Sequence, residues 1–209
     1  MKQIALTFDD GPSIGITDQI LEKLHNYHIV ASFFVIGDKI SDSTSYLLKQ
    51  AFESGCEIQN HSRTHSNMTQ LTKEDILTEI NTTSNKIYDV VGVKPTFFRP
   101  PYIALNANMF DTIHLPMIAG IGAQDWEPNV TSEQRATMIL EHACDGAIIL
   151  LHDMDGNQYT VDALDLIIPG LLQQGYEFVT ISDLFAQKKV IPNTTKNVIY
   201  SNVLYPTYY

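Results

Sequence analysis

Short apolar runs alternate along the chain with longer segments in which apolar residues recur every three or four positions. The runs are typical of strands buried on both faces, and the periodic segments are typical of amphipathic helices. The predicted strands cover residues 4–6, 31–36, 57–59, 96–98, 116–121, 147–151 and 178–181. The predicted helices cover residues 13–27, 43–54, 72–91, 106–113, 132–143, 160–174 and 182–187. This alternation predicts an α/β fold in which helices connect parallel strands.

The number of strand-helix units favours a closed barrel over an open sheet. We therefore predict a single-domain, distorted (β/α) barrel with about seven parallel strands. A chain of 209 residues, 44% of them hydrophobic, suffices for one domain with a full core, although two small domains also fit this length. We assign residues 1–189 to the domain. Residues 190–209, rich in Tyr, Asn, Thr and Pro, form a tail that either packs on the barrel or begins a linker.

Charge and hydropathy exclude several kinds of partner. The chain has 24 acidic and 13 basic residues, so neither nucleic acid nor an anionic membrane is an expected partner. No apolar run is long enough to span a membrane. Met1 and Lys2 lead directly into the first strand without a secretory signal. The chain is then either cytoplasmic or a module of a longer secreted protein, and we favour the second. We expect Cys56 and Cys144 to be buried free thiols.

The first strand ends in two adjacent carboxylates, Asp9 and Asp10, which Gly11 and Pro12 follow. Adjacent acids repel each other and require a nearby cation. Neighbouring side chains of a strand point to opposite faces, but a turn can aim both acids into one cavity. One acid can then hold a metal ion while the other takes a proton from water. Alternatively, these residues form a polar turn in which Asp10 or Ser13 caps the next helix.

Other polar residues also follow predicted strands, where the active sites of parallel barrels lie. They are His61 and His65, residues 99–102, Asp125 with Trp126, and His152 with Asp153. His61 and His65 are four residues apart, a spacing that metal sites use, although solvated surface histidines are also common. With Asp10 they would form a set of three ligands with open positions, as in a hydrolytic metal site.

Five short motifs in this order resemble those of the polysaccharide deacetylases, the NodB-homology carbohydrate esterases. They are Thr7-Phe8-Asp9-Asp10-Gly11-Pro12, His61-Ser62-Arg63-Thr64-His65, Arg99-Pro100-Pro101-Tyr102, Asp125-Trp126 and Leu150-Leu151-His152. The first three are specific together, whereas the last two are short. Gly122 departs from the family, which usually has an acid three positions before the Asp of the fourth motif. A contact that supports His152 or the metal is therefore in doubt.

The resemblance implies that Asp10, His61 and His65 hold one divalent metal ion. Two imidazoles and a carboxylate favour zinc or cobalt. It also implies that Asp9 is the catalytic base and pairs with Arg99, which supplies the cation that the two acids require.

The resemblance assigns the remaining site residues to the oxyanion, the leaving group and the acetyl group. The backbone N–H of Tyr102 would face the oxyanion. His152, held by Asp125, would protonate the departing alcohol or amine. Trp126 and Leu150 would wall a small apolar pocket for the acetyl methyl.

The implied activity is metal-dependent hydrolysis of acetyl groups on a polysaccharide or oligosaccharide, with release of acetate. We favour O-acetyl xylan, which would make the chain an acetylxylan esterase. The alternative is N-deacetylation of chitin, chito-oligosaccharides or peptidoglycan, and the acidity of the chain disfavours an anionic wall polymer. Two further hypotheses are a carbohydrate-binding module without turnover, which Gly122 favours, and an unrelated barrel. We expect an extracellular protein in which other modules accompany this one.

Overall fold

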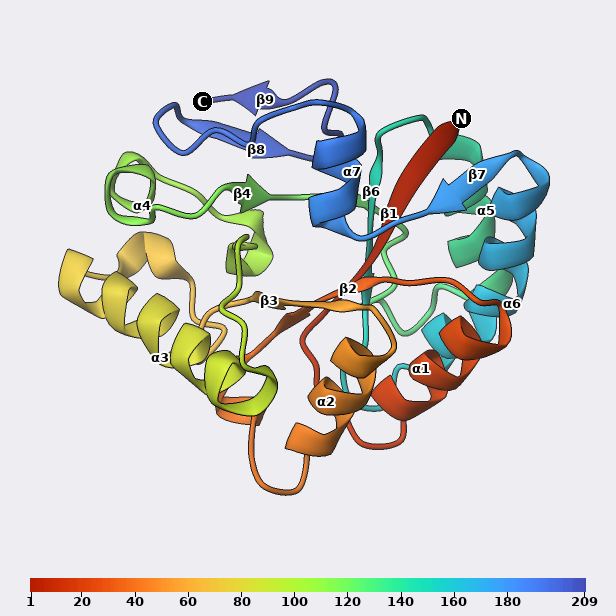
Figure 1. Cartoon of the computed structure of the whole chain (residues 1–209), viewed down its shortest axis with the longest axis horizontal. Coiled ribbons are helices and arrows are strands. Elements are labelled where there is room, and N and C mark those ends of the chain that lie inside the picture. Colours follow the sequence, from red (N-terminus) through yellow and green to blue (C-terminus); the bar gives the residue numbers. More distant parts are fainter.

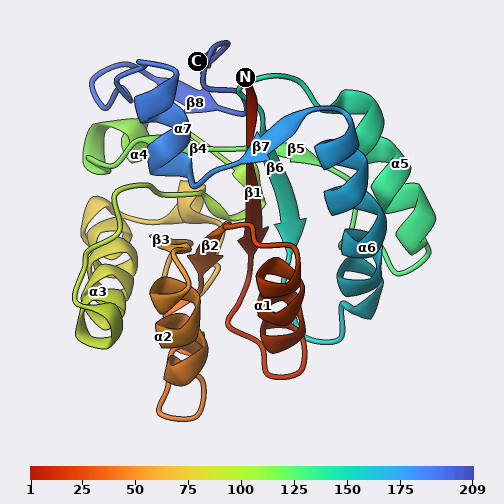
Figure 2. The same ribbon diagram turned by 45° about the vertical axis from the view of Figure 1, so that its right-hand side comes forward.

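The computed structural model describes all residues from Met1 to Tyr209 and has parallel strands at its centre (Figure 1). The strands are β1 (Lys2–Asp9), β2 (Ser32–Val35), β3 (Glu57–Asn60), β4 (Met117–Ile118), β5 (Ile121–Gly122), β6 (Ile148–His152), β7 (Tyr176–Phe178), β8 (Val198–Tyr200) and β9 (Thr207–Tyr208). The helices are α1 (Thr17–Asn26), α2 (Ser45–Glu53), α3 (Lys73–Val91), α4 (Ala107–Thr112), α5 (Ser132–His142), α6 (Gln158–Gln173) and α7 (Ile181–Gln187). Figure 2 shows the long helices around the outside of the strands.

The strands form two sheets that backbone contacts join into a distorted barrel. The larger sheet has the order β3-β2-β1-β6-β5, with β7 also beside β1, and the smaller has the order β4-β8-β9. All strand pairs are parallel except β8 with β9. Phe98 bridges Asn60 and Met117, and Ala147 bridges Asn202. Each sheet is thereby connected to the other on both sides, which confirms the predicted α/β barrel.

Both faces of β1 are buried, which explains its continuous apolar sequence. Leu6 and Phe8 belong to the largest apolar cluster, which also contains residues of α1, α2, α5 and α6. Ala5 belongs to a second cluster with Phe34 and Ile148. One face of β1 therefore packs under the helices and the other lines the barrel interior, so the end of β1 lies near the centre of the molecule.

Several predicted boundaries differ from the structure. The helix predicted at residues 13–27 begins only at Thr17, because a turn with Gly15 at φ +87° comes first. The strand predicted at residues 178–181 lies instead at Tyr176–Phe178 (β7), because Thr180 caps α7 and Ile181 is the first residue of that helix. The strand predicted at residues 116–121 is split into β4 and β5.

The strand predicted at residues 96–98 is wrong. Only Phe98 takes part in a β-bridge. The backbone N–H groups of Thr96 and Phe97 instead donate to the side-chain oxygen of Gln59, both at 2.9 Å. The Gln59 side chain thus takes the place of a backbone acceptor for these two N–H groups, while the backbone carbonyl of Phe97 accepts the Asn60 N–H at 3.3 Å.

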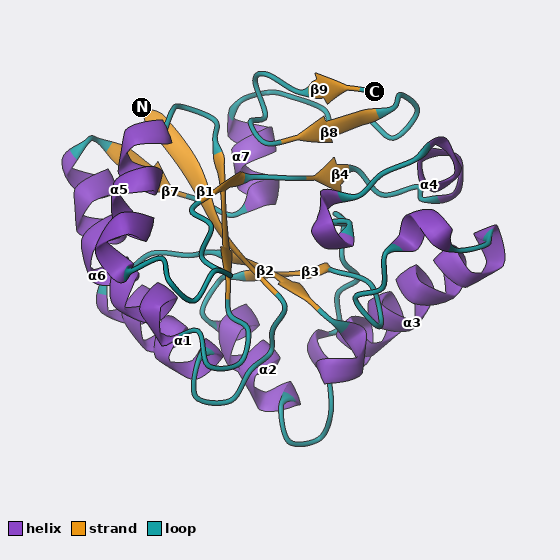
Figure 3. Cartoon of the chain, turned by 180° about the vertical axis from the view of Figure 1, so that it is seen from behind, coloured by secondary structure: helices purple, strands orange, loops and turns teal.

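The C-terminal residues add β8 beside β4 and β9 beside β8, as Figure 3 shows from behind. Val198, Tyr200 and Val203 are buried in the same cluster as Ala5. Both cysteines are free, and Cys56 is buried as expected, but Cys144 is exposed, which corrects the prediction for that thiol. No helix combines the length and apolarity that crossing a membrane requires.

Candidate active site and metal centre

A cavity of about 510 Å³ lies where β1, β3 and β6 end. Most of the predicted site residues line it: Asp9, Asp10, His61, His65, Tyr102, Trp126, Leu150 and His152. Arg99 and Asp125 are fully buried next to residues of the lining. The barrel therefore brings together the polar residues that follow separate strands, as the sequence predicts.

The turn after β1 directs both acids towards His61. Asp10 has a φ of +76°, a left-handed conformation that reverses the alternation of a strand. Oδ2 of Asp9 is 3.6 Å and Oδ1 of Asp10 is 3.3 Å from Nε2 of His61. The helix-cap alternative is excluded, because the N-cap position of α1 is Ile16 and no side chain caps it. Gly11 has no room for a Cβ, which would lie 2.1 Å from the Asp153 carboxylate.

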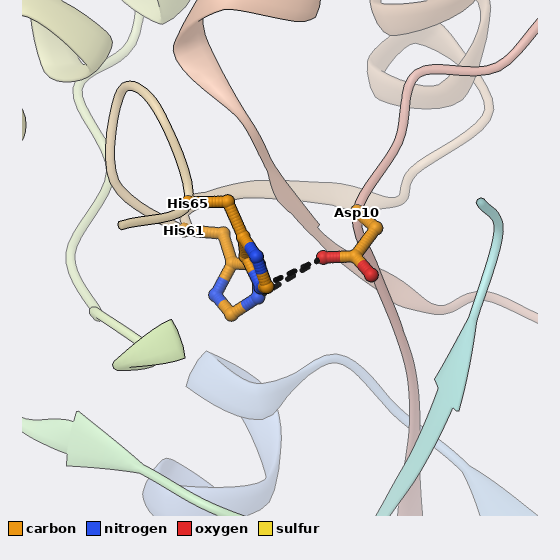
Figure 4. Close-up of side chains that lie close together, drawn as sticks. All are labelled: Asp10, His61 and His65. Carbon is orange, nitrogen blue, oxygen red and sulfur yellow. Dashed lines mark ion pairs between the residues drawn. The ribbon is translucent and has the colours of Figure 1, made fainter. Parts of the chain in front are cut away.

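Asp10, His61 and His65 converge on a common point (Figure 4). Oδ1 of Asp10 lies 3.3 Å from Nε2 of His61 and 3.2 Å from Nε2 of His65. Ligands at about 2.0–2.2 Å from a zinc ion stand roughly 3–3.5 Å apart, so these separations suit a shared ion. The same Oδ1 is buried and accepts no hydrogen bond. This donor set fits a divalent cation.

The hydrogen bond of His61 and the pKa values of Asp10 and His65 also suit a metal. Nδ1 of His61 donates to the carbonyl oxygen of Arg99 at 2.7 Å, which leaves the Nε2 lone pair directed towards Asp10. Burial raises the pKa of Asp10, but its interactions with the nearby His61 and His65 outweigh burial and bring this pKa to about 2. Partial burial holds the pKa of His65 below its ordinary value. An ionised carboxylate and neutral imidazoles are what metal ligation requires.

Arg99 provides the cation that the sequence requires beside the two acids. Its guanidinium is fully buried and ion-pairs with Oδ1 of Asp9. It also donates to Thr7 Oγ1 at 2.9 Å and to the Ala119 carbonyl at 2.7 Å, and it lies 4.0 Å from the centre of the Phe34 ring. These contacts fix the direction of the Asp9 carboxylate, whose Oδ2 remains directed towards His61.

His152 is held on the opposite side of the cavity by Asp125. Nδ1 of His152 is 2.8 Å from Oδ1 of Asp125, and the His152 backbone N–H donates to Oδ2 at 2.7 Å. Burial lowers the pKa of His152, but the hydrogen bond and charge of Asp125, with the charges of Asp9 and Asp10, outweigh it and raise this pKa to about 9. The rings of Trp126 and His152 pack edge to face, with 5.6 Å between the ring centres. The raised pKa favours the protonated form of His152 at neutral pH, which is the form that a proton donor requires.

Three residues that support Asp125 were missed by sequence reasoning. Thr160 donates to Oδ2 of Asp125 at 2.8 Å, and Arg135 donates to Thr160 at 2.8 Å and to Asn157 at 2.6 Å. Arg135 lies on the buried face of α5, between Ser132 and Ala136. The sequence signal for this contact was Arg135 itself, a charged residue on the face of the predicted helix that is otherwise buried.

Gly122 leaves the His152–Asp125 pair intact. A Cβ at Gly122 would lie 3.8 Å from the Leu150 carbonyl oxygen and 3.9 Å from the Trp126 ring, which are ordinary van der Waals contacts at the edge of the cavity. Nε of Arg99 is buried without a hydrogen-bond partner. Asp125 contacts His152 directly through two hydrogen bonds. The absence of an acid at Gly122 therefore leaves His152 supported.

Comparison with known proteins agrees with this geometry. The sequence model for polysaccharide deacetylase matches residues 1–115. A bifunctional xylanase/deacetylase of Pseudobutyrivibrio xylanivorans is 46% identical over 202 residues, 97% of this chain and 33% of that protein. The peptidoglycan-N-acetylglucosamine deacetylase PgdA of Listeria monocytogenes is 36% identical over 191 residues, 90% of this chain and 40% of that protein. The chain thus spans well under half the length of these two relatives.

Among solved structures, a family 4 acetyl xylan esterase from Clostridium thermocellum, in complex with a cobalt ion, is 40% identical with a TM-score of 0.94. The similarity covers 97% of this chain and 99% of that one. The matched residues 1–115 contain the first three motifs, and the fold brings the other two to the same cavity. This chain belongs to the polysaccharide deacetylase family.

Proposed function

We propose that this chain removes O-acetyl groups from acetylated xylan by metal-dependent hydrolysis and releases acetate. One observation carries the proposal: the unpartnered Asp10 carboxylate faces two imidazole nitrogens beside the Asp9–Arg99 pair. A xylanase/deacetylase and an acetyl xylan esterase are among the similar proteins, and both match nearly the whole chain.

Asp10, His61 and His65 would hold the metal ion, for which zinc and cobalt suit the two imidazoles and one carboxylate. When bound, such an ion lowers the pKa of water and polarises a carbonyl oxygen. Asp9, held by Arg99 next to His61, takes the proton of the attacking water. The buried guanidinium keeps Asp9 oriented for this transfer throughout the reaction.

The opposite wall of the cavity handles the acetyl group and the leaving sugar. Leu150 and Trp126 enclose the acetyl methyl, and both line the cavity. The backbone of Tyr102, held at φ +59°, presents its N–H to the developing oxyanion. His152 gives its proton to the departing sugar oxygen, and Asp125 stabilises the imidazolium before that step.

The alternative substrate is an N-acetyl amino sugar, because the same groups can release an amine. The PgdA relative favours this reading, but its similarity is lower and the charge of −11 disfavours an anionic polymer. Acetate release should be measured on acetylated xylan, chito-oligosaccharides and peptidoglycan with added zinc or cobalt. We expect release from xylan. Release of acetate from the amino sugars alone would overturn the xylan proposal. If the chain hydrolysed no ester with any added metal, the hypothesis of a carbohydrate-binding module would be favoured.

We further propose that this chain acts outside the cell as one module of a longer protein. The match to one third of a bifunctional xylanase/deacetylase supports a multidomain context. A xylan polymer is too large to enter a cell, which supports an extracellular site of action. Detection of the chain in culture supernatant as part of a larger polypeptide would test both points, and its retention in the cytoplasm would contradict them.

The Asp125→Asn variant should lose activity at a lower pH than wild type. His152 serves as an acid only while protonated, so activity is present below its pKa and is lost as pH rises through it. Asn removes the charge that most raises this pKa, so the alkaline limb of kcat shifts to lower pH. The measurement needs an acetylated sugar, because an aryl ester has a leaving group that requires no proton. Asp162→Asn, at an exposed site of α6, is the control, and an unmoved limb in Asp125→Asn would refute the assignment.

A further inference from the structure

The loop of residues 61–65 carries both imidazoles of the metal centre in a conformation that needs support. Ser62 has a φ of +67° and His65 a φ of +59°, which are left-handed values that side chains with a Cβ disfavour. Nδ1 of His61 is anchored on the Arg99 carbonyl. No such bond anchors the ring of His65, which only packs against the Tyr102 ring, 4.7 Å away between ring centres, so the backbone of the loop decides where this ligand lies.

Glu79, on α3, binds the middle of this loop. Its Oε2 accepts the backbone N–H groups of Arg63 and Thr64, both at 2.8 Å. Its Oε1 accepts the Thr64 hydroxyl at 2.9 Å. Glu79 is only 8% exposed. Successive backbone N–H groups that converge on a buried anion form a rigid cradle, and hydrogen bonds to an ionised acceptor are stronger than neutral ones.

The other contacts of the loop backbone are neutral. Asn60 Oδ1 accepts the Ser62 N–H at 2.8 Å, and Ser62 Oγ accepts the His65 N–H at 3.0 Å. The backbone N–H groups of residues 37 and 38 donate to the carbonyls of Ser62 and Arg63, both at 2.9 Å. Among these supports only Glu79 carries a charge, and it binds the two residues that precede His65.

We propose that Glu79 is a positioning residue that sets the affinity of the metal centre by holding the loop of residues 61–65. This inference rests on the metal-dependent function proposed above. Glu79 does not touch the ligand atoms. It acts by keeping the loop in the conformation in which Nε2 of His65 faces Asp10. If only a fraction of molecules held that conformation, the apparent dissociation constant would rise by the inverse of that fraction.

Two variants separate the effect of the length of the Glu79 side chain from the effect of its charge. Glu79→Asp keeps the charge but is one methylene shorter, so its carboxylate withdraws from the loop. Glu79→Gln keeps the length, and its oxygen can accept both N–H groups while the Thr64 hydroxyl turns to Ser66 Oγ, 2.7 Å away. We expect zinc to bind Glu79→Asp about 10- to 100-fold more weakly than wild type, and Glu79→Gln to show a smaller loss.

The dissociation constants should be measured by competition of the metal-free proteins with a chromophoric chelator for zinc. The absorption spectrum of the cobalt-loaded proteins adds a readout of ligand geometry, which a merely structural role of Glu79 would not change. Glu74→Asp and Glu74→Gln are matched controls, because Glu74 lies on α3 and is exposed. Both controls should bind zinc with wild-type affinity.

A folded Glu79→Asp variant with wild-type zinc affinity and cobalt spectrum would overturn the inference, even if its Tm were lower. If Glu79→Asp did not fold, Glu79→Gln would decide, because equal affinity of Glu79→Gln and Glu74→Gln would also overturn it. Failure of the wild-type chain to bind zinc or cobalt would instead contradict the proposed function. The two failures are therefore distinguishable.

Discussion

We expect the Asp9→Asn variant to lose about 10²- to 10⁴-fold in kcat for acetate release, the usual contribution of a positioned general base. Asn has nearly the same shape, and its oxygen can still accept the hydrogen bond of Arg99. What it loses is the ability to take a proton from water. Zinc affinity should stay near that of wild type, because the cluster of metal-binding residues consists of Asp10, His61 and His65.

Three measurements on the same preparation separate the possible effects of Asp9→Asn. Activity on acetylated xylan reports catalysis, a zinc titration reports the metal centre, and thermal unfolding reports the buried pair with Arg99. The variant should unfold cooperatively, since the guanidinium keeps its bonds to Thr7 and Ala119. Normal activity in Asp9→Asn would show that the assigned base is wrong.

Removal of the metal should lower activity by about 10³-fold or more, because charge stabilisation by such an ion is worth several kcal/mol. A chelator should therefore silence the enzyme, and zinc or cobalt should restore it. Magnesium should restore it poorly, since that ion prefers oxygen ligands to imidazole. Metal binding should also raise Tm, because a ligand that binds only the folded state stabilises that state.

The His65→Ala variant provides a matched control for the chelation experiment. It removes one of the three ligands, so higher concentrations of zinc should be needed to restore activity. An enzyme that keeps full activity after exhaustive chelation would rule out the metal-dependent mechanism. If the same zinc concentration restored the activity of wild type and of His65→Ala, His65 would not be a ligand of the metal ion.

The cavity contains an acid paired with a buried cation on one side and an imidazole paired with a buried acid on the other. On one side the fixed positive charge of Arg99 faces Asp9. On the other side Asp125 faces His152 and favours the imidazolium. Arg99 thus orients the Asp9 carboxylate, and Asp125 favours the protonated imidazole of His152, so one cavity holds both kinds of group.

The sequence by itself determined the fold class and the set of residues at the cavity. The fold class and the polar residues follow from local patterns: the apolar run of β1 reflects burial on two faces, and Asp9, His61 and His152 each lie at or just after the end of a strand. The cavity walls Trp126 and Leu150 followed from the family resemblance. In a parallel barrel all such ends meet on one side, so linear position predicts proximity. The catalytic roles of these residues remain predictions for the experiments above.

Only the tertiary structure decided the partners that lie far apart in sequence. Gln59 binds the segment at residues 96 and 97, Thr160 binds Asp125 across 35 residues, and Glu79 binds the loop at residues 63 and 64. The physical reason is that a hydrogen bond needs two groups at about 3 Å in the right direction. A one-dimensional pattern contains the burial period of each element but not the distances between elements, so these contacts emerge only when the barrel closes.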